Sequence, residues 1–495
     1  ELTPPEPDFF YLLVNHELNS TQGVARDHGN AGAFVSKWTI NKTTHEVVAG
    51  DDLIKQVFDW NEGTQSFSVA STTFDRLCSS DRPMPTALFN SGSGKGTEEI
   101  IYFNGEETSG GRAFAHIVTG PNAGNSYQLE HFGFTAFENV VLSPFEQDKT
   151  VAVMLDDSSN GEVYVYVGDK QNTGLEVEKA GLIGGNLYSV AVPGKVAEVQ
   201  DDLSTSIGPA PETFELKLIG TDEDRPVDGS DVTARGLDTL TPPDPTQTFE
   251  SLKFGGPEDG SWDTRPGREN FFYFVTKGTS SNGRNTPTRI WQLEFNDIAD
   301  PALGGTLTLL KDGPETRLGS LDNTAFEVIG GEGRFYIQED LGGESRLSKI
   351  WEYDIATGDV VEIAQHDAAR FFDGGSEFLT TNEESSGIIS LKDVLGEGWF
   401  ASSVQVHTSS GLSNAAEQVE YGQLLLLNVS GRSNDLQRNR IIKSGDLWNF
   451  RVDGVDPGAT WNQSGFTIDG DWNKATDGTM LGPQPSMLGY GEAAS

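Results

Sequence analysis

Short runs of β-branched and aromatic residues recur along the chain, and each run is bounded by Gly, Asn or Asp. Such runs are typical of β-strands separated by tight turns. They lie at residues 10–14, 33–40, 100–103, 114–118, 150–155, 163–167, 187–192, 214–218, 271–276, 290–295, 306–310, 335–338, 350–353, 387–390, 399–406 and 424–429. No segment keeps the 3.6-residue apolar period of a long amphipathic helix, so the pattern predicts an all-β protein.

Some of these runs follow one another closely enough to form antiparallel hairpins. Residues 151–155 and 162–167 make one such pair, and residues 333–338 and 349–353 make another. Repeated hairpins are expected in a β-propeller, in which four-stranded blades surround a channel. The spacing is too irregular for a count of blades, and the strand pattern alone leaves a β-sandwich as an equal alternative. The 58 glycines and 22 prolines, spread along the chain, suit the many turns of either fold.

The charge balance narrows the classes of partner. The chain has 75 Asp and Glu against 34 Lys and Arg, a formal net charge of −41. This excess repels phosphate backbones and anionic lipid surfaces, so neither nucleic acid nor membrane is an expected partner. No run of 18 apolar residues is present, which excludes a membrane-spanning helix. The chain begins at Glu1, as a mature product would after removal of a signal peptide, and we expect a secreted, periplasmic or extracellular protein.

Carboxylates cluster at the turns that follow or precede the predicted strands. The clusters lie at residues 15–17, 104–107, 137–139, 155–157, 257–260, 338–340 and 382–384. In a propeller the inner strands deliver residues to one axis, where clustered acids would need a cation such as Ca²⁺ with its six to eight oxygen ligands. Any single acidic pair is more simply a solvated loop charge, so the metal interpretation depends on the recurrence.

The single cysteine, Cys78, lies in the polar segment 75–81. One cysteine excludes an internal disulfide and a zinc ribbon, and no Cys/His pattern indicates a thiol nucleophile. It is either a small buried residue or a thiolate ligand for a transition metal. We interpret His16, His28 and His407 as structural, and the glycine-rich residues 92–97 as a turn that lacks P-loop spacing.

Several motifs together resemble the PhoX family of alkaline phosphatases. The most specific is Pro-Glu-Asp-Gly-Ser-Trp-Asp at 257–263, followed by the strand 271–276. Gly-Glu-Glu at 105–107 with Gly-Arg-Ala-Phe at 111–114 comes next, and then Leu-Asp-Asn-Thr-Ala-Phe at 321–326. The order also includes Asn-His-Glu at 15–17 and the lone cysteine. The match covers roughly residues 8–430.

The resemblance implies a six-bladed propeller over residues 1–440, with iron and calcium at its centre, that hydrolyses small phosphate monoesters outside the cytoplasm. It implies iron ligation by Cys78 and Glu138, and calcium or bridging ligation by Glu107 and Glu258. By the same resemblance the remaining calcium ligands are Asp157, Asp340 and Glu384. Residues 441–495 have no counterpart in the family, and we expect them to form an extension that adds strands or an extracellular assembly surface.

The sequence departs from the family pattern at Gly256. The family commonly has an arginine immediately before Pro-Glu-Asp, where a guanidinium would hold phosphate in bidentate fashion. Asn90 and Arg112 are the residues of this chain expected to contact the phosphate, with Arg268 as a further substitute for the missing arginine.

Two other functions remain open from the sequence. Without the arginine, the chain could be a non-catalytic propeller, stabilised by calcium, that acts as an extracellular binding or structural protein. A third hypothesis is a phytase-like or lactonase-like hydrolase that uses calcium alone, and the presence of iron separates it from the first.

Overall fold

The structure is a computed structural model that describes residues 8–198, 206–220, 251–279, 286–313, 318–343 and 346–429, and the backbone of two later strands. The chain divides into two compact units, Glu1–Asn428 and Val429–Ser495. In the second unit β27 (Leu447–Phe450) pairs antiparallel with β28 (Asn473–Thr476). The domain boundary predicted at residue 440 lies outside the described residues. No helix in the described residues is long and apolar enough to cross a membrane.

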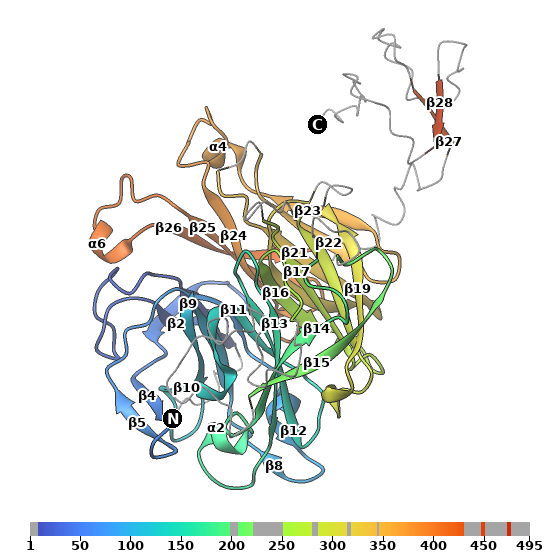
Figure 1. The fold of residues 1–495 in the computed structure, drawn as a ribbon. Coiled ribbons are helices and arrows are strands. Elements are labelled where there is room, and N and C mark those ends of the chain that lie inside the picture. Colours follow the sequence, from blue (N-terminus) through green and yellow to red (C-terminus); the bar gives the residue numbers. More distant parts are fainter. Residues whose placement is uncertain are drawn as a thin grey trace. The chain divides into compact units, whose positions relative to one another are not determined.

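The described residues of the first unit form a β-propeller of six blades that follow one another in chain order, from blue through green and yellow to orange in Figure 1. The first three blades are β1 (Phe9–His16), β2 (Phe34–Asn41) and β3 (Val47–Asp52); β4 (Gln56–Asn61), β5 (Ser66–Ala70), β6 (Leu77–Asp81), β9 (Ile101–Ile117) and β10 (Asn125–Gln128); and β11 (Phe134–Leu142), β12 (Lys149–Asp156), β13 (Val163–Asp169) and β14 (Asn186–Ala191). The last three are β16 (Pro257–Trp262), β17 (Phe271–Thr276), β18 (Arg289–Phe295) and β19 (Gly305–Asp312); β20 (Leu321–Ile329), β21 (Glu332–Glu339), β22 (Lys349–Asp354) and β23 (Val360–Gln365); and β24 (Glu383–Ser390), β25 (Trp399–Val406) and β26 (Tyr421–Asn428). The predicted all-β propeller is therefore confirmed over the sandwich.

Short elements connect the blades. β15 (Glu212–Gly220) pairs with both β14 and β19 and joins the third blade to the fourth at their outer edges. The remaining elements are β7 (Phe89–Asn90), β8 (Lys95–Gly96), the helices α1 (Pro85–Leu88), α2 (Glu176–Lys179), α4 (Ala368–Phe371), α5 (Lys392–Leu395) and α6 (Ala415–Gln418), and the 3₁₀ turns η1 (Glu130–Phe132) and η5 (Pro301–Leu303).

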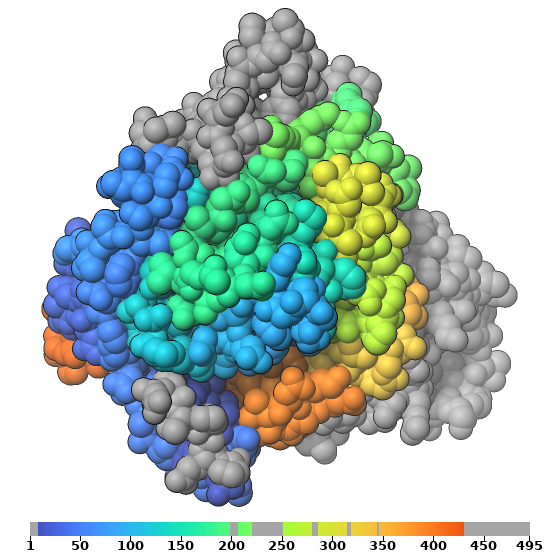
Figure 2. Space-filling model, turned by 90° about the horizontal axis from the view of Figure 1, so that it is seen from below, coloured from blue at the N-terminus to red at the C-terminus, as the bar shows by residue number. Residues whose placement is uncertain are grey.

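The hydrophobic core lies between the blades. Among the described residues, six clusters of buried apolar side chains each combine residues of two successive blades. Between the third and fourth blades, for example, Val153 and Val165 pack with Trp262 and Trp291. The ring closes where Phe10 and Leu12 of β1 pack with Ala401 of β25, and the blue and orange surfaces adjoin there in Figure 2. Burial of these faces draws the polar inner strands together at the centre.

Every predicted run lies in a strand or extends past one by a single residue. The runs 100–103 and 114–118, predicted as two strands, belong to the single strand β9. The reason is a large bulge in β9 between Glu107, which pairs with Ala136 of β11, and Arg112, which pairs with Phe134. Gly110 has φ +69°, and a Cβ on Gly111 would lie 2.0 Å from the Glu106 carbonyl oxygen, so glycine permits the bulge.

A buried carboxylate ties three inner strands together. Asp259 of β16 accepts hydrogen bonds from Asn139 Nδ2 of β11 at 2.7 Å and from Thr324 N of β20 at 2.9 Å. Its Oδ1 also accepts the Gly260 N–H at 2.7 Å. Burial raises the pKa of Asp259 to about 6, although these donors oppose the shift. Asp259 therefore sets the spacing of β11, β16 and β20.

We predict that Asp259→Ala lowers the free energy of unfolding by about 3 kcal/mol, because it leaves buried donors of two neighbouring blades without an acceptor. Chemical denaturation monitored by tryptophan fluorescence measures the change. The control is Asp51→Ala, which removes an exposed carboxylate of β3 and should change stability by less than about 0.5 kcal/mol. An equal effect of the two substitutions would contradict this role of Asp259.

Candidate metal centre

Eight carboxylates and the thiol meet at the inner strands of the propeller. They form four groups of three, and within each group the possible ligand atoms lie within 4.8 Å of one another. The groups are Glu17, Cys78 and Glu107; Glu107, Glu138 and Asp157; Glu138, Glu258 and Asp322; and Asp322, Asp340 and Glu384. Because neighbouring groups share a residue, the nine side chains form one continuous row, which we call the ligand row.

Every blade contributes to the ligand row. Glu17 directly follows β1, Asp157 follows β12 and Asp340 follows β21. The other members lie within strands: Cys78 in β6, Glu107 in β9, Glu138 in β11, Glu258 in β16, Asp322 in β20 and Glu384 in β24. The expectation that these acids lie in turns between strands was therefore wrong for most of them. Six of the nine members lie within strands, most of them inner strands.

Irregularities in the strand pairing present four of these ligands. The register shifts between Leu77 and Ser80, between Phe137 and Asn139, between Pro257 and Gly260, and between Leu321 and Thr324. These shifts contain Cys78, Glu138, Glu258 and Asp322, respectively. A β-bulge bends its strand and re-aims a side chain, which explains how residues of different blades reach one place.

Burial and mutual repulsion raise the pKa values of seven members of the ligand row. Burial is the largest cause for each of the seven, and neighbouring carboxylates add to it. The pKa of Glu17 is raised to about 7, those of Glu107 and Glu138 to about 8, and that of Asp340 to about 6. The pKa values of Glu258, Asp322 and the Cys78 thiol are raised well above their ordinary values. Full ionisation of the row therefore requires additional positive charge.

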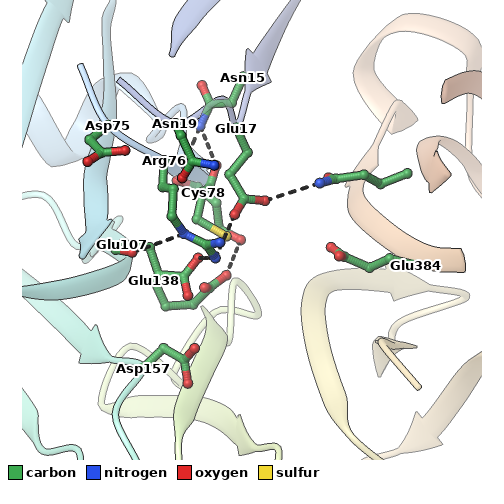
Figure 3. A network of polar contacts seen from close by, with 12 residues as sticks. Asn15, Glu17, Asn19, Asp75, Arg76, Cys78, Glu107, Glu138, Asp157 and Glu384 are labelled. Carbon is green, nitrogen blue, oxygen red and sulfur yellow. Dashed lines mark hydrogen bonds and ion pairs between the residues drawn. The ribbon is translucent and has the colours of Figure 1, made fainter. Parts of the chain in front are cut away.

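Three basic side chains supply part of that charge. Arg76 forms ion pairs with Glu17 at 2.7 Å and with Glu107, and Figure 3 shows it between these two carboxylates with Cys78 beside them. Lys277 pairs with Asp157 and with Glu258 at 2.9 Å. His407 lies 3.2 Å from Glu384 and 3.1 Å from Glu420, whose hydrogen bonds raise its pKa to about 10. The acids still outnumber these cations.

The ligand row also has oxygen atoms that the protein leaves unused. Asp157 Oδ1 and Asp340 Oδ1 are buried, and neither has a hydrogen-bond partner among the described residues. An unpaired buried carboxylate oxygen is unfavourable unless it binds a cation. Groups of three carboxylates suit calcium, and the group with the Cys78 thiol also suits a transition metal. The residues therefore fit bound metal ions.

A polar cleft opens beside the ligand row. Its volume is about 340 Å³, and its lining includes Glu17, Arg76, Asp340, Glu384, Gln405 and His407. In Figure 3, Glu384 faces Glu17 and Arg76 from a distance. The amides of Asn19, Gln22 and Asn382 complete much of the wall. A small polar molecule can therefore reach ions held by the ligand row.

The structure brings all seven metal ligands predicted from the sequence into the ligand row: Cys78, Glu107, Glu138, Asp157, Glu258, Asp340 and Glu384. Their role as ligands stays a prediction. Sequence reasoning missed Glu17 and Asp322 as ligands. Both stand in motifs already recognised, Asn-His-Glu at 15–17 and Leu-Asp-Asn at 321–323, so the signal was present.

Asn90 and Arg112, expected to contact the phosphate, lie outside the ligand row. Asn90, the last residue of the short strand β7, donates from Nδ2 to Asp148 Oδ1 at 2.7 Å. Arg112 donates from Nε and Nη2 to the two oxygens of Glu106, both at 2.8 Å. Arg268 stacks on Phe271 and lies 3.6 Å from Asp263. Contacts with other residues of the protein therefore explain the positions of these three side chains, and no bound phosphate is needed to explain them.

We predict that metal-free protein loses stability as the pH rises from about 4.5 to about 8. A carboxyl whose pKa is raised on folding binds more protons when folded than when unfolded in this range, so deprotonation favours the unfolded state. Glu107 and Glu138, with pKa values of about 8, lose their protons toward the upper end of this range. The melting temperature, measured after chelation at pH 5 and pH 8, should be lower at pH 8.

Two variants separate the ligand row from the general acidity of the chain. Glu138→Gln removes one titrating group and should reduce the difference between the two pH values. Asp169→Asn removes an exposed carboxylate at the end of β13 and should leave the difference unchanged. A melting temperature of the metal-free protein that is higher at pH 8 would exclude this account.

Comparisons with known proteins bear on the fold. No protein-family model matches the sequence, and no curated protein is significantly similar to it. The structure is similar to that of Pseudomonas fluorescens PhoX in complex with vanadate, a transition state analogue, with a TM-score of 0.59 and 12% identity over 87% of each chain. A periplasmic gluconolactonase of Pseudomonas aeruginosa also matches, with 12% identity over 85% of this chain and 99% of that chain. Its TM-score of 0.30 is too low to support a conclusion about the fold. The chain therefore has a propeller fold related to that of PhoX.

Proposed function

We propose that the protein is a metal-dependent phosphatase that hydrolyses small phosphate esters at the ligand row. The observation that carries the proposal is the continuous row of nine possible ligands, to which all six blades contribute. The propeller fold shared with PhoX supports it, and so do the motifs that resemble the PhoX family. A scaffold that used calcium only for stability would not need a thiol and eight carboxylates in overlapping groups beside an open cleft.

The chemistry of the donors suggests which ions bind. Glu17, Cys78 and Glu107 combine sulfur with oxygen, which suits iron. The groups further along contain only carboxylates, which suits calcium. When bound, these ions would act as Lewis acids toward the phosphoryl oxygens and invert the negative potential of the site.

The residues of the chain hold the ligand row in shape. Ser79 Oγ donates to Glu138 Oε1 at 2.6 Å, and Asn323 Nδ2 donates to Ser79 Oγ at 2.5 Å. These bonds orient Glu138 from two blades at once. Asn15 donates to the Cys78 carbonyl and fixes the bulge that presents the thiol. The site is thus positioned on strands before a substrate arrives.

We also propose that the protein lies outside the cytoplasm. The calcium concentration is high there, so calcium sites of extracellular proteins are filled even when they bind weakly. The assembly role expected of residues 441–495 stays a prediction, because most of that segment lies outside the described residues.

We predict that purified protein contains iron and calcium and hydrolyses p-nitrophenyl phosphate, and that EDTA abolishes the activity until metal is restored. Glu138→Gln should lower kcat by about 100-fold or more, because Glu138 belongs to two neighbouring groups. Asp169→Asn is the control and should keep wild-type activity. Elemental analysis and steady-state kinetics give the result. Folded protein that holds metal but neither hydrolyses the ester nor binds vanadate would leave only a non-catalytic role.

A second prediction separates iron from calcium. Cys78→Ser replaces the soft thiolate by a hydroxyl, so the protein should lose iron and any iron-dependent colour while it retains calcium. Elemental analysis and visible absorption measure the change. Retention of iron by this variant would show that Cys78 is no ligand, and wild-type protein with calcium alone would favour the calcium-only hydrolase.

A further inference from the structure

Lys277 occupies a special place among the basic residues of the ligand row. It directly follows β17, and its Nζ contacts Asp157 Oδ2 and lies 2.9 Å from Glu258 Oε1. Asp157 belongs to the group with Glu107 and Glu138, whereas Glu258 belongs to the group with Glu138 and Asp322. Lys277 therefore spans two neighbouring groups at the point where they share Glu138.

Arg76 and His407 are placed differently. Both acids that pair with Arg76, Glu17 and Glu107, belong to one group. Of the two acids that pair with His407, Glu384 is an end of the ligand row and Glu420 lies outside it. Lys277 differs from both, because its two partners belong to different groups of the ligand row.

Gly256 gives the Lys277 side chain its room. A Cβ at position 256 would lie 2.8 Å from Lys277 Cγ and 3.0 Å from Cε, both closer than van der Waals contact. The Lys277 N–H donates to the Gly256 carbonyl at 2.9 Å, and Gly256 itself has φ +70°. The Lys277 side chain can therefore take its path to Asp157 and Glu258 because residue 256 is a glycine.

The ammonium remains available to a ligand. An ammonium has three N–H donors, and the two carboxylates account for two of them. The Lys277 side chain is 41% exposed, so a molecule from solvent can reach it. Next to it, Asp157 is 6% exposed and its Oδ1 has no hydrogen-bond partner among the described residues. The third N–H donor of Lys277 thus lies beside the carboxylate of Asp157, whose Oδ1 is without a partner among the described residues. This arrangement is expected where a bound cation and an anionic ligand meet.

We propose that Lys277 is a substrate-binding residue that donates a hydrogen bond to a phosphoryl oxygen of the phosphate ester. The proposal rests on the phosphatase function proposed above. A tetrahedral phosphoryl group carries several anionic oxygens, so one of them could accept a hydrogen bond from the ammonium while the neighbouring groups would hold the ions that neutralise the others. Lys277 thereby supplies the basic side chain that position 256 lacks.

The test compares metal-loaded wild-type protein with Lys277→Gln, Lys277→Arg and the control Lys149→Gln. Lys149 also forms an ion pair, with Asp169 at 3.5 Å, and is about as exposed, at 39%, but lies outside the ligand row. The readouts are KM and kcat for p-nitrophenyl phosphate, the inhibition constants of inorganic phosphate and vanadate, metal content and melting temperature.

We expect Lys277→Gln to raise KM and the inhibition constant of phosphate by about 10- to 100-fold, the effect of losing one charge-assisted hydrogen bond, with metal content unchanged. Lys277→Arg should recover a large part of the loss, and Lys149→Gln should match wild type. A Lys277→Gln protein that loses metal or stability but keeps its phosphate affinity overturns the proposal, because the lysine would then be a counter-charge only. Unchanged constants in Lys277→Gln overturn this role alone, whereas wild-type protein that neither turns over nor binds phosphate overturns the phosphatase function as well.

Discussion

The repulsion between buried carboxylates is the constraint on which this propeller depends. Six apolar clusters between the blades draw the inner strands together, and that same packing forces eight carboxylates and a thiol into one small space. Burial of the apolar faces stabilises the ring, while burial of the acids opposes it. The two effects are coupled, because the strands that carry the acids are the strands that the clusters hold in place.

The chain reduces this repulsion in two ways. Arg76 and Lys277 bring positive charge to fixed points, and both depend on unusual backbone: Arg76 itself has φ +49°, and Lys277 requires Gly256 with φ +70°. A non-glycine residue in the left-handed region is strained, and such strain is concentrated at functional sites. A hydrogen bond from Ser79 stabilises the carboxylate of Glu138. These groups do not neutralise all of the negative charge of the ligand row, and bound cations would neutralise the rest.

The sequence predicted the middle strands of most blades, but it missed the inner strands β6, β11, β16 and β20 and the outer strands β3, β5 and β23. Residues 163–167 alternate valine and tyrosine, which point to the two faces of the sheet, and this pattern directly predicts a strand. The inner strand β16 reads Pro-Glu-Asp-Gly-Ser-Trp, and its polar residues, glycine and bulge hide the strand pattern. The acids were therefore recognised from their recurrence and from the family resemblance. Their convergence, and the membership of Glu17 and Asp322, depend on ring closure, which is a long-range property that local patterns do not contain.

Ring closure gives the ligand row a further meaning. The first blade, β1–β3, and the last, β24–β26, are separate sheets in the described part of the chain, and they meet through side-chain packing without an exchanged strand. The ligand row begins at Glu17 in the first blade and ends at Glu384 in the last. Its two ends therefore belong to parts of the chain more than three hundred residues apart, and they come together only when the circle is complete. A newly made chain cannot assemble this row until its last blade has been synthesised and has docked, so completion of the site and closure of the ring are a single event.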